Sequence, residues 1–232
     1  MPAMKYRRRL ISTENLIKQG VLAQESLLQS ASAEGASQIG WKLGFSSPAA
    51  KTRFGTNRAL VGFLLDKNQV PNNSTIDISQ WVKPVLEPEI AIYFDKDVNP
   101  GEDIFNSVSA VGPAYELADL FAMHENPLDV TSSNIYQRHF ILGSKNVKLR
   151  DLDLAHLSAT VDGNDVADVE GFVGSMKSLL GDFAIDLQYY NRTIKAGDFV
   201  ITGSIIPPIF IERGQRHSYT VSGFEELTVN FS

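Results

Sequence analysis

Three glutamates lie in apolar stretches of this sequence, and their positions suggest chemistry at one shared site. Glu87 and Glu89 are two residues apart in "VLEPEIAIYF" (residues 85–94), and Glu116 lies in "PAYELAD". If residues 85–94 form a strand, Glu87 and Glu89 point to the same face, because side chains alternate along a strand. Two like charges on one face repel each other unless a cation lies between them or water surrounds both. The spacing therefore points to a bound cation or to a solvated strand face.

The residue types that the chain offers decide which cation these carboxylates could hold. The chain has no cysteine, which excludes thiolate metal sites, disulfides and cysteine nucleophiles. It has four histidines, and no two of them form a metal-binding pair such as H-E-x-x-H. Carboxylates without thiolates or paired imidazoles suit a hard cation, and we expect Mg²⁺ or Mn²⁺. The E-x-E pattern is weak by itself, and its central Pro88 also fits a strand start or a sheet edge.

Sequence motifs of several large enzyme classes are absent. The chain has no G-x-S-x-G elbow, no P-loop and no G-x-G-x-x-G dinucleotide fingerprint. Its net charge of −6 argues against a nucleic-acid partner, whose binding surface would be basic. No apolar run approaches the roughly 20 residues that a membrane-spanning helix needs. We therefore expect a soluble, cytoplasmic protein that binds neither nucleic acid nor a membrane.

Helical and strand patterns follow one another without regular alternation or internal repeat, which predicts an α+β fold. Apolar residues recur at helical spacing over residues 5–35, with a break expected near Gly20, and again over residues 173–190. Residues 59–64 and 85–94 have the composition of strands. Further strands are expected within residues 114–121, 140–149, 158–171, 195–204 and 227–232, and a short helix within residues 100–112.

The length and composition fit a single folded unit. The 232 residues, 43% of them hydrophobic and 21% charged, suit one large domain or two small ones. No linker-like segment interrupts the chain. We therefore predict a helical N-terminal arm over residues 1–35 and one domain over residues 36–232.

Several blocks of the sequence follow one another in a recognisable order. They are "IGWKLGFSSPAAKTRFG", "LEPEIAIYF", "VGPAYELAD", "SSNIYQRHFILG" and "IKAGDFVITGS". This series resembles the fumarylacetoacetate hydrolase superfamily, and within it the branch of 2-keto-4-pentenoate hydratases and 4-oxalocrotonate decarboxylases. The resemblance runs from about residue 22 to the C-terminus. It implies a catalytic domain with the mixed β-roll or barrel of the fumarylacetoacetate hydrolase C-terminal domain, and assembly into homo-oligomers.

The resemblance also implies which residues bind the metal and face the substrate. Glu87, Glu89 and Glu116 match the three carboxylates that hold Mg²⁺ or Mn²⁺ in the family. Lys42, in "GWKLG", matches the lysine that faces the substrate near that metal, and it is the best candidate for proton transfer or for binding the substrate carboxylate.

Five further residues are expected near the same site. Thr202 and Gly203 match the segment that lines the substrate pocket, and Ser47 lies in a loop near it. Ser133 and Asn134 stand where these hydratases often have an Asp-Asn pair. Together with Lys42, they complete the expected catalytic set.

The resemblance implies an enzyme acting on a small 2-oxo or 2-hydroxydienoic acid. The first expectation is a hydratase that adds water to a 2-hydroxy-2,4-dienoate in aromatic-compound catabolism. Two other reactions use the same metal-bound enolate, namely decarboxylation of a 4-oxalocrotonate-type acid and C–C hydrolysis of an acylpyruvate. A fourth alternative is a non-catalytic member of the family, because Ser133 replaces the usual aspartate.

Overall fold

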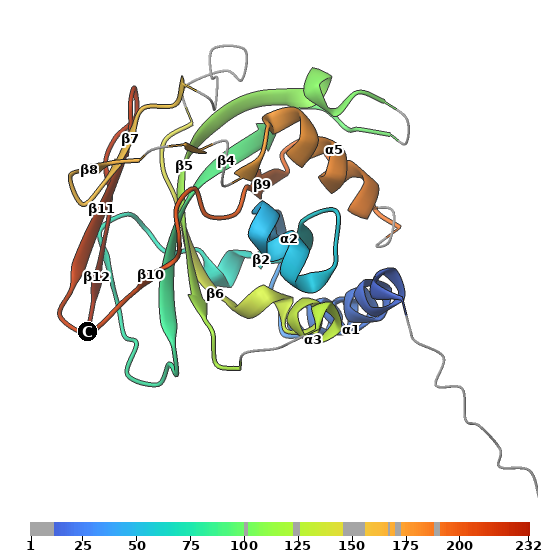
Figure 1. The fold of residues 1–232 in the computed structure, drawn as a ribbon, viewed down its shortest axis with the longest axis horizontal. Coiled ribbons are helices and arrows are strands. Elements are labelled where there is room, and N and C mark those ends of the chain that lie inside the picture. The colour runs from blue at the N-terminus through green and yellow to red at the C-terminus, as the bar shows by residue number, and fades with distance from the viewer. Residues whose placement is uncertain are drawn as a thin grey trace, which may run out of the picture.

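Two β-sheets form the body of the structure, a computed structural model that describes residues 12–99, 102–122, 126–145, 156–166, 168–169, 173–187 and 191–232. The larger sheet curls into a half-barrel, the smaller sheet lies against it on one side, and the helices gather on the other (Figure 1). The predicted α+β fold with a mixed β-roll or barrel is therefore confirmed.

The larger sheet is built around its two longest strands. These are β4 (Pro84–Phe94) and β5 (Val108–Asp119), which pair antiparallel along almost their whole length. The strand order is β2-β1-β9-β4-β5-β6, with β10 paired to β4 beside the end of β9. The other strands are β1 (Gln38–Gly44), β2 (Leu60–Leu65), β6 (Gln137–Leu142), β9 (Phe199–Ile201) and β10 (Ile209–Phe210).

The smaller sheet packs on one face of the larger one and buries the main apolar core. Tyr219 and Val229 of this sheet share that core with Leu86 and Tyr115 of the larger sheet. The rings of Tyr115 and Tyr219 lie 5.6 Å apart between centroids. Its strand order is β3-β12-β11-β7-β8. The strands are β3 (Ser74–Ile76), β7 (Ala159–Val161), β8 (Asn164–Asp165), β11 (Arg216–Val221) and β12 (Leu227–Phe231).

Four α-helices and three short 3₁₀ turns complete the described part of the chain. Ile17 of α1 and Val130 of α3 pack with Val85 and Ala118, on the opposite face of the larger sheet from the main core. Phe183 of α5 instead belongs to the main core. The helices are α1 (Thr13–Ala33), α2 (Pro48–Phe54), α3 (Pro127–Ser132) and α5 (Met176–Leu187). The 3₁₀ turns are η1 (Asp66–Asn68), η2 (Ile104–Ser107) and η3 (Asn134–Tyr136).

Gly20 does not break the N-terminal helix, so that part of the prediction is wrong. Helix α1 continues through Gly20, and the absence of a side chain there lets α1 pack closely against α3. A Cβ at this position would lie 2.7 Å from the Cβ of Thr131 in α3. The glycine therefore serves packing and not chain reversal. The predicted helix residues 5–11 lie outside the described residues.

The short helix expected within residues 100–112 is also mostly wrong. Only the 3₁₀ turn η2 forms there, and β5 begins at Val108. Pairing of β5 with β4 takes up these residues, which local helix propensity could not anticipate. No helix in the described part of the chain combines the length and the apolar character that crossing a membrane requires.

Candidate metal centre

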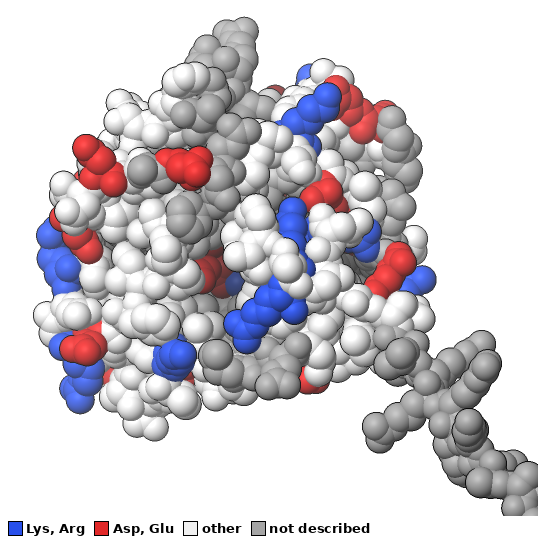
Figure 2. All heavy atoms as spheres, viewed as in Figure 1, with Lys and Arg blue, Asp and Glu red and all other residues white. Residues whose placement is uncertain are grey.

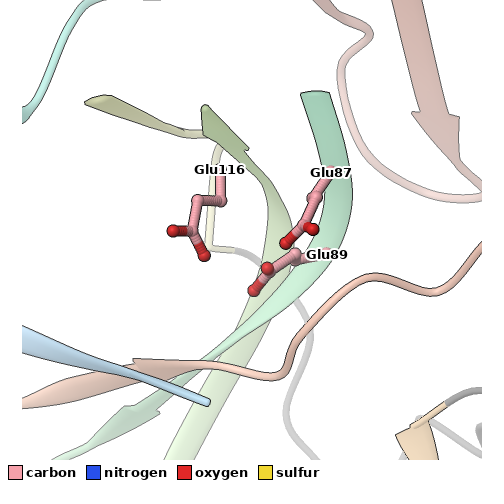
Figure 3. A group of neighbouring side chains, drawn as sticks. All are labelled: Glu87, Glu89 and Glu116. Carbon is pink, nitrogen blue, oxygen red and sulfur yellow. The ribbon is translucent and has the colours of Figure 1, made fainter. Parts of the chain in front are cut away.

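The pairing register of β4 and β5 brings the three glutamates together. Glu87 lies directly opposite Glu116, and Glu89 lies two residues further along β4. Directly opposite residues, and residues two apart on one strand, share a face of the sheet. All three side chains therefore point toward one space on the same face of the sheet (Figure 3). One carboxylate oxygen from each residue lies within 4.8 Å of the other two.

Burial and mutual repulsion make the ionised form of this cluster costly. Glu89 and Glu116 are fully buried, whereas Glu87 keeps part of its surface exposed. Burial raises the pKa of the Glu87 carboxyl to about 7, the charge of Glu116 adds to the effect, and Lys42 opposes it. Burial also raises the pKa of Glu89 well above its usual value, with the two neighbouring glutamates adding to it. The pKa of Glu116 is raised by burial against the opposing charge of Lys42.

Two buried oxygen atoms show that the cluster fits a cation. Oε1 of Glu89 and Oε2 of Glu116 accept no hydrogen bond in the described part of the chain. A buried acceptor without a donor costs about 1–3 kcal/mol. Three carboxylates provide an all-oxygen ligand set, which suits a hard divalent cation such as Mg²⁺ or Mn²⁺. A cation among them would satisfy both oxygens and relieve the repulsion.

Lys42 of β1 lies against this cluster and is only 2% exposed. Its Nζ contacts Oε1 of Glu116 and donates to the carbonyl oxygen of Ile135 at 3.1 Å. Gly62, its partner across β1 and β2, leaves room for the lysine stem. A Cβ on Gly62 would lie 2.8 Å from Cγ of Lys42. The structure therefore brings Lys42 and the three glutamates into one group.

A pocket with a volume of about 370 Å³ opens over this group, with Lys42 and Glu87 in its lining. Figure 2 shows acidic and basic atoms at the bottom of a hollow in the middle of the viewed face. Ser46, Ser47 and Ser204 supply hydroxyl groups, and most of the other described lining residues are apolar. The site is thus a charged floor beneath largely apolar walls.

Comparison with known proteins finds relatives named as decarboxylases and hydratases. No family model matches the chain. The chain is 27% identical over 205 residues to 4-oxalocrotonate decarboxylase from Pseudomonas putida, covering 83% of this chain and 77% of the relative. It is 23% identical over 210 residues to 2-keto-4-pentenoate hydratase 2 from Dechloromonas aromatica, covering 86% of this chain and 80% of the relative. The chain is a homologue of these hydratases and decarboxylases.

Solved structures of the fumarylacetoacetate hydrolase family share the fold of this homologue. One is 4-oxalocrotonate decarboxylase from Pseudomonas putida G7, complexed with magnesium and adipate. It has a TM-score of 0.79 at 22% identity, covering 97% of this chain and 100% of that chain. Another is fumarylpyruvate hydrolase from Pseudomonas aeruginosa, in complex with Mn²⁺ and pyruvate. It has a TM-score of 0.59 at 17% identity, covering 82% of this chain and 88% of that chain. The predicted resemblance is confirmed as homology to hydratases and decarboxylases and as a shared fold.

In this hydratase and decarboxylase homologue, Ser133 and Asn134 bond to the backbone. Oδ1 of Asn134 accepts from the N–H of Phe63 at 2.9 Å, and its Nδ2 donates to the Phe63 carbonyl at 2.9 Å. The hydroxyl of Ser133 donates to the Val130 carbonyl at 2.8 Å. Neither residue is among the described residues that line the pocket. Their catalytic roles stay predictions.

Asn134 does hold a strained segment against Lys42. Asn134, Ile135 and Tyr136 have φ values of 53°, 54° and 63°, three successive left-handed residues without a glycine. Such conformations cost about 1–3 kcal/mol each and cluster at functional sites. The two bonds from Asn134 to β2 fix this segment, which points the Ile135 carbonyl at Lys42.

Thr202 and Gly203 lie behind the glutamates and outside the described pocket lining. The N–H of Gly203 donates to Oε2 of Glu89 at 2.9 Å. The Thr202 hydroxyl accepts from the N–H of Ile90 at 3.1 Å and donates to the Gly203 carbonyl at 3.0 Å. Gly203 has φ +85°, and a Cβ there would lie 2.7 Å from Oγ of Ser46. These two residues therefore hold Glu89 in place.

The predicted Ser47 lines the pocket, and its Oγ caps α2 by accepting from the N–H of Ala50 at 3.2 Å. The sequence analysis missed Ser204. Its hydroxyl oxygen is buried, has no hydrogen-bond partner among the described residues, and belongs to a residue in the pocket lining. The block "AGDFVITGS", which ends at Ser204, was the available signal.

Proposed function

We propose that this chain is a metal-dependent hydro-lyase that adds water to a 2-hydroxy-2,4-dienoate of the 2-keto-4-pentenoate type. The observation that carries the proposal is the convergence of three carboxylates within 4.8 Å beside the buried Lys42. The group lies on the floor of a pocket in a homologue of such hydratases. An all-oxygen site of this kind suits a substrate that offers its own carboxylate and C2 oxygens as ligands.

Glu87, Glu89 and Glu116 would hold the cation, Mg²⁺ or Mn²⁺. When bound, it would supply Lewis-acid stabilisation of negative charge on the substrate's C2 oxygen, and orient the substrate carboxylate. Related solved proteins support this choice of ions, since they contain magnesium or Mn²⁺. The unpartnered oxygens of Glu89 and Glu116 are the features of this chain that support it independently.

Lys42 is the residue that we assign to proton transfer. Hydration requires a proton to reach C5 of the dienol as it becomes a ketone, and water then adds at C4, giving a 4-hydroxy-2-oxo acid. Nζ of Lys42 would deliver that proton, since it lies on the pocket floor and is held by Glu116 and the Ile135 carbonyl. The apolar walls would exclude water other than the one molecule that adds to the substrate.

The direct test is an absorbance assay with 2-hydroxypenta-2,4-dienoate. The wild-type chain should consume the dienoate with Mg²⁺ or Mn²⁺, and excess EDTA should stop the reaction. Glu89→Gln keeps the shape of the side chain but removes a ligand charge, so kcat/KM should fall by about 1,000-fold, or roughly 4 kcal/mol of transition-state stabilisation. Glu225→Gln, at an exposed position, is the matched control. An unchanged dienoate with both metals, or a fully active Glu89→Gln variant, would contradict the proposal.

A decarboxylase of 4-oxalocrotonate-type acids is the second candidate. It is supported by the 27% identity to one such enzyme and by the TM-score of 0.79 to another. Carbon dioxide release from an oxalocrotonate-type acid, without hydration of the dienoate, would select it. Cleavage of an acylpyruvate would select the C–C hydrolase alternative, and turnover of any of these acids would exclude a non-catalytic protein.

Three further expectations stay predictions. They are assembly into homo-oligomers, a cytoplasmic location and a role in aromatic-compound catabolism.

A further inference from the structure

The pocket is charged at its floor, and its walls are apolar further toward the solvent. Along β5, Ala118 follows Glu116 on the same face, and Leu120 comes just after the strand. Along β1, Phe45 follows the strand that carries Lys42. Lys42 and Glu116 are almost fully buried, whereas Phe45 and Leu120 are half-buried. The apolar residues therefore lie between the charged floor and the solvent.

A further segment of the lining has the same character. It consists of Ile206, Pro207 and Pro208, which follow the segment that holds Glu89. Among the described residues that line the pocket, Lys42 is the one basic side chain. Its Nζ is already engaged by Glu116 and the Ile135 carbonyl. The described walls thus offer no cation to a charged group above the floor.

We propose that the pocket selects acids with one carboxylate and an apolar tail, and rejects dicarboxylates of the same length. The inference rests on the proposed function, because the carboxylate and C2 oxygen must first be held at the floor. A second carboxylate between Phe45, Leu120 and Ile206 would lose its water without gaining a cation, and the hydroxyl groups of the lining cannot neutralise its charge, which strongly opposes binding. An apolar tail gains from the same walls, by about fourfold in affinity for each buried methylene.

Basic residues near the mouth do not change this selection. Cζ of Arg53, in α2, lies 5.3 Å from the centroid of the Phe54 ring. Arg138 forms an ion pair with Asp119, with Nη2 3.2 Å from Oδ2. Both lie outside the described pocket lining. Figure 2 shows basic side chains beside the hollow, over α2. Such charges raise the local concentration of anions, and of dianions more than monoanions, but they are not among the described lining residues and so give a carboxylate held between the apolar walls no partner.

The pocket is large enough to hold an acid whose tail is longer than that of a five-carbon acid. Its 370 Å³ falls within the range of roughly 300–1,000 Å³ that is usual for drug-sized ligands. The selection also separates the two candidate reactions. A 2-hydroxydienoate with an alkyl tail has one carboxylate, whereas an oxalocrotonate-type acid has two.

The test is calorimetric titration of the full chain, in excess Mg²⁺, with two unreactive acids of equal length. These are 2-oxohexanoate, which ends in a methyl group, and 2-oxoadipate, which ends in a carboxylate. We expect 2-oxohexanoate to bind at least 30-fold more tightly, because only the dicarboxylate buries an unpaired charge. 2-Oxobutanoate, two methylenes shorter, should bind about 15-fold more weakly than 2-oxohexanoate.

Two variants test whether the walls cause the selection. Leu120→Lys and Ile206→Lys each place a cation in the apolar wall, and each should tighten 2-oxoadipate binding by about tenfold or more. Ile185→Lys is the matched control, because Ile185 is 48% exposed on α5 and is not among the lining residues.

The outcomes separate this inference from the proposed function. If neither acid binds in Mg²⁺, the proposed function fails and the inference fails with it. If both bind equally, or 2-oxoadipate binds more tightly, the inference is wrong while the proposed function stands. A preference for 2-oxohexanoate that both lysine variants leave unchanged would also overturn it, since the walls would then not be the cause.

Discussion

Two buried charged groups of this protein differ in their balance of charge. At the pocket, Glu87, Glu89 and Glu116 gather beside Lys42, the one basic side chain among the described lining residues. Away from the pocket, Asp186 of α5 forms an ion pair with Arg58, and their side chains are 7% and 15% exposed. The first group has three acids and one base, whereas the second pairs one acid with one base.

The difference indicates which group awaits a ligand. The pocket group leaves two buried carboxylate oxygens without a partner and opens to a cavity, so a bound cation would complete it. The Arg58–Asp186 pair instead joins the segment before β2 to α5. Even this pair is costly, because burial raises the pKa of Asp186 to about 7 while Arg58 opposes the shift. A balanced buried pair is therefore structural and need not be strongly stabilising.

The largest expected effect on stability comes from Asp186. Its folded pKa of about 7 lies above its ordinary value of 3.8, so the folded protein binds more protons than the unfolded chain between these pH values. The free energy of unfolding should therefore fall as the pH rises through this window, by on the order of 4 kcal/mol from this group. Asp186→Asn should remove that part of the pH dependence. Urea unfolding at pH 4, 6 and 8 in excess EDTA measures it.

The difference between wild type and Asp186→Asn isolates this residue, because the pocket glutamates titrate in both proteins. If the pair with Arg58 outweighed burial, the opposite sign would result. Asp186→Asn would then lose stability relative to wild type as the pH rises, and the view of this pair as costly would be wrong.

Asn134 gives the next largest effect, and it tests how the pocket floor is held. Asn134→Ala leaves the buried N–H and carbonyl of Phe63 without partners and frees the left-handed segment. We expect a loss of about 2–3 kcal/mol of stability, because unsatisfied buried groups cost about 1–3 kcal/mol each and relief of backbone strain offsets part of this. Asn57→Ala, at an exposed position, is the control. Equal stability of the two variants in thermal unfolding would show that the hydrogen bonds from Asn134 to β2 do not stabilise the fold.

Glu89→Gln should give the smallest change in stability, and in the opposite direction. Without metal, removing one of three crowded charges should stabilise the folded chain by about 1–2 kcal/mol. Wild type should gain stability when Mg²⁺ is added, and the variant should gain much less, because one ligand charge is lost. Thermal unfolding with and without EDTA measures both effects. A variant that is less stable than wild type in EDTA would show that the cluster is not under repulsion.

Local patterns gave several elements of the fold correctly. The apolar periodicity of residues 173–190 is observed as α5, and the strand-like run of residues 85–94 is observed as β4. The patterns failed where a distant contact decides the structure. Gly20 stays helical because Thr131 packs against it, and residues from Val108 onward form a strand because β4 pairs with them. The polar strand β11 had no local signal and forms between β7 and β12.

The sequence by itself determined the chemistry that the site can offer. With no cysteine and no histidine pair, only oxygen ligands suit a metal among these residues, and strand alternation puts Glu87 and Glu89 on one face. Only the tertiary structure decided that Glu116 lies opposite Glu87, that Lys42 reaches Glu116, and that Asn134 bonds to β2. Alternation is a property of a single strand, whereas register and approach depend on pairing between segments far apart in the chain, which no local pattern encodes.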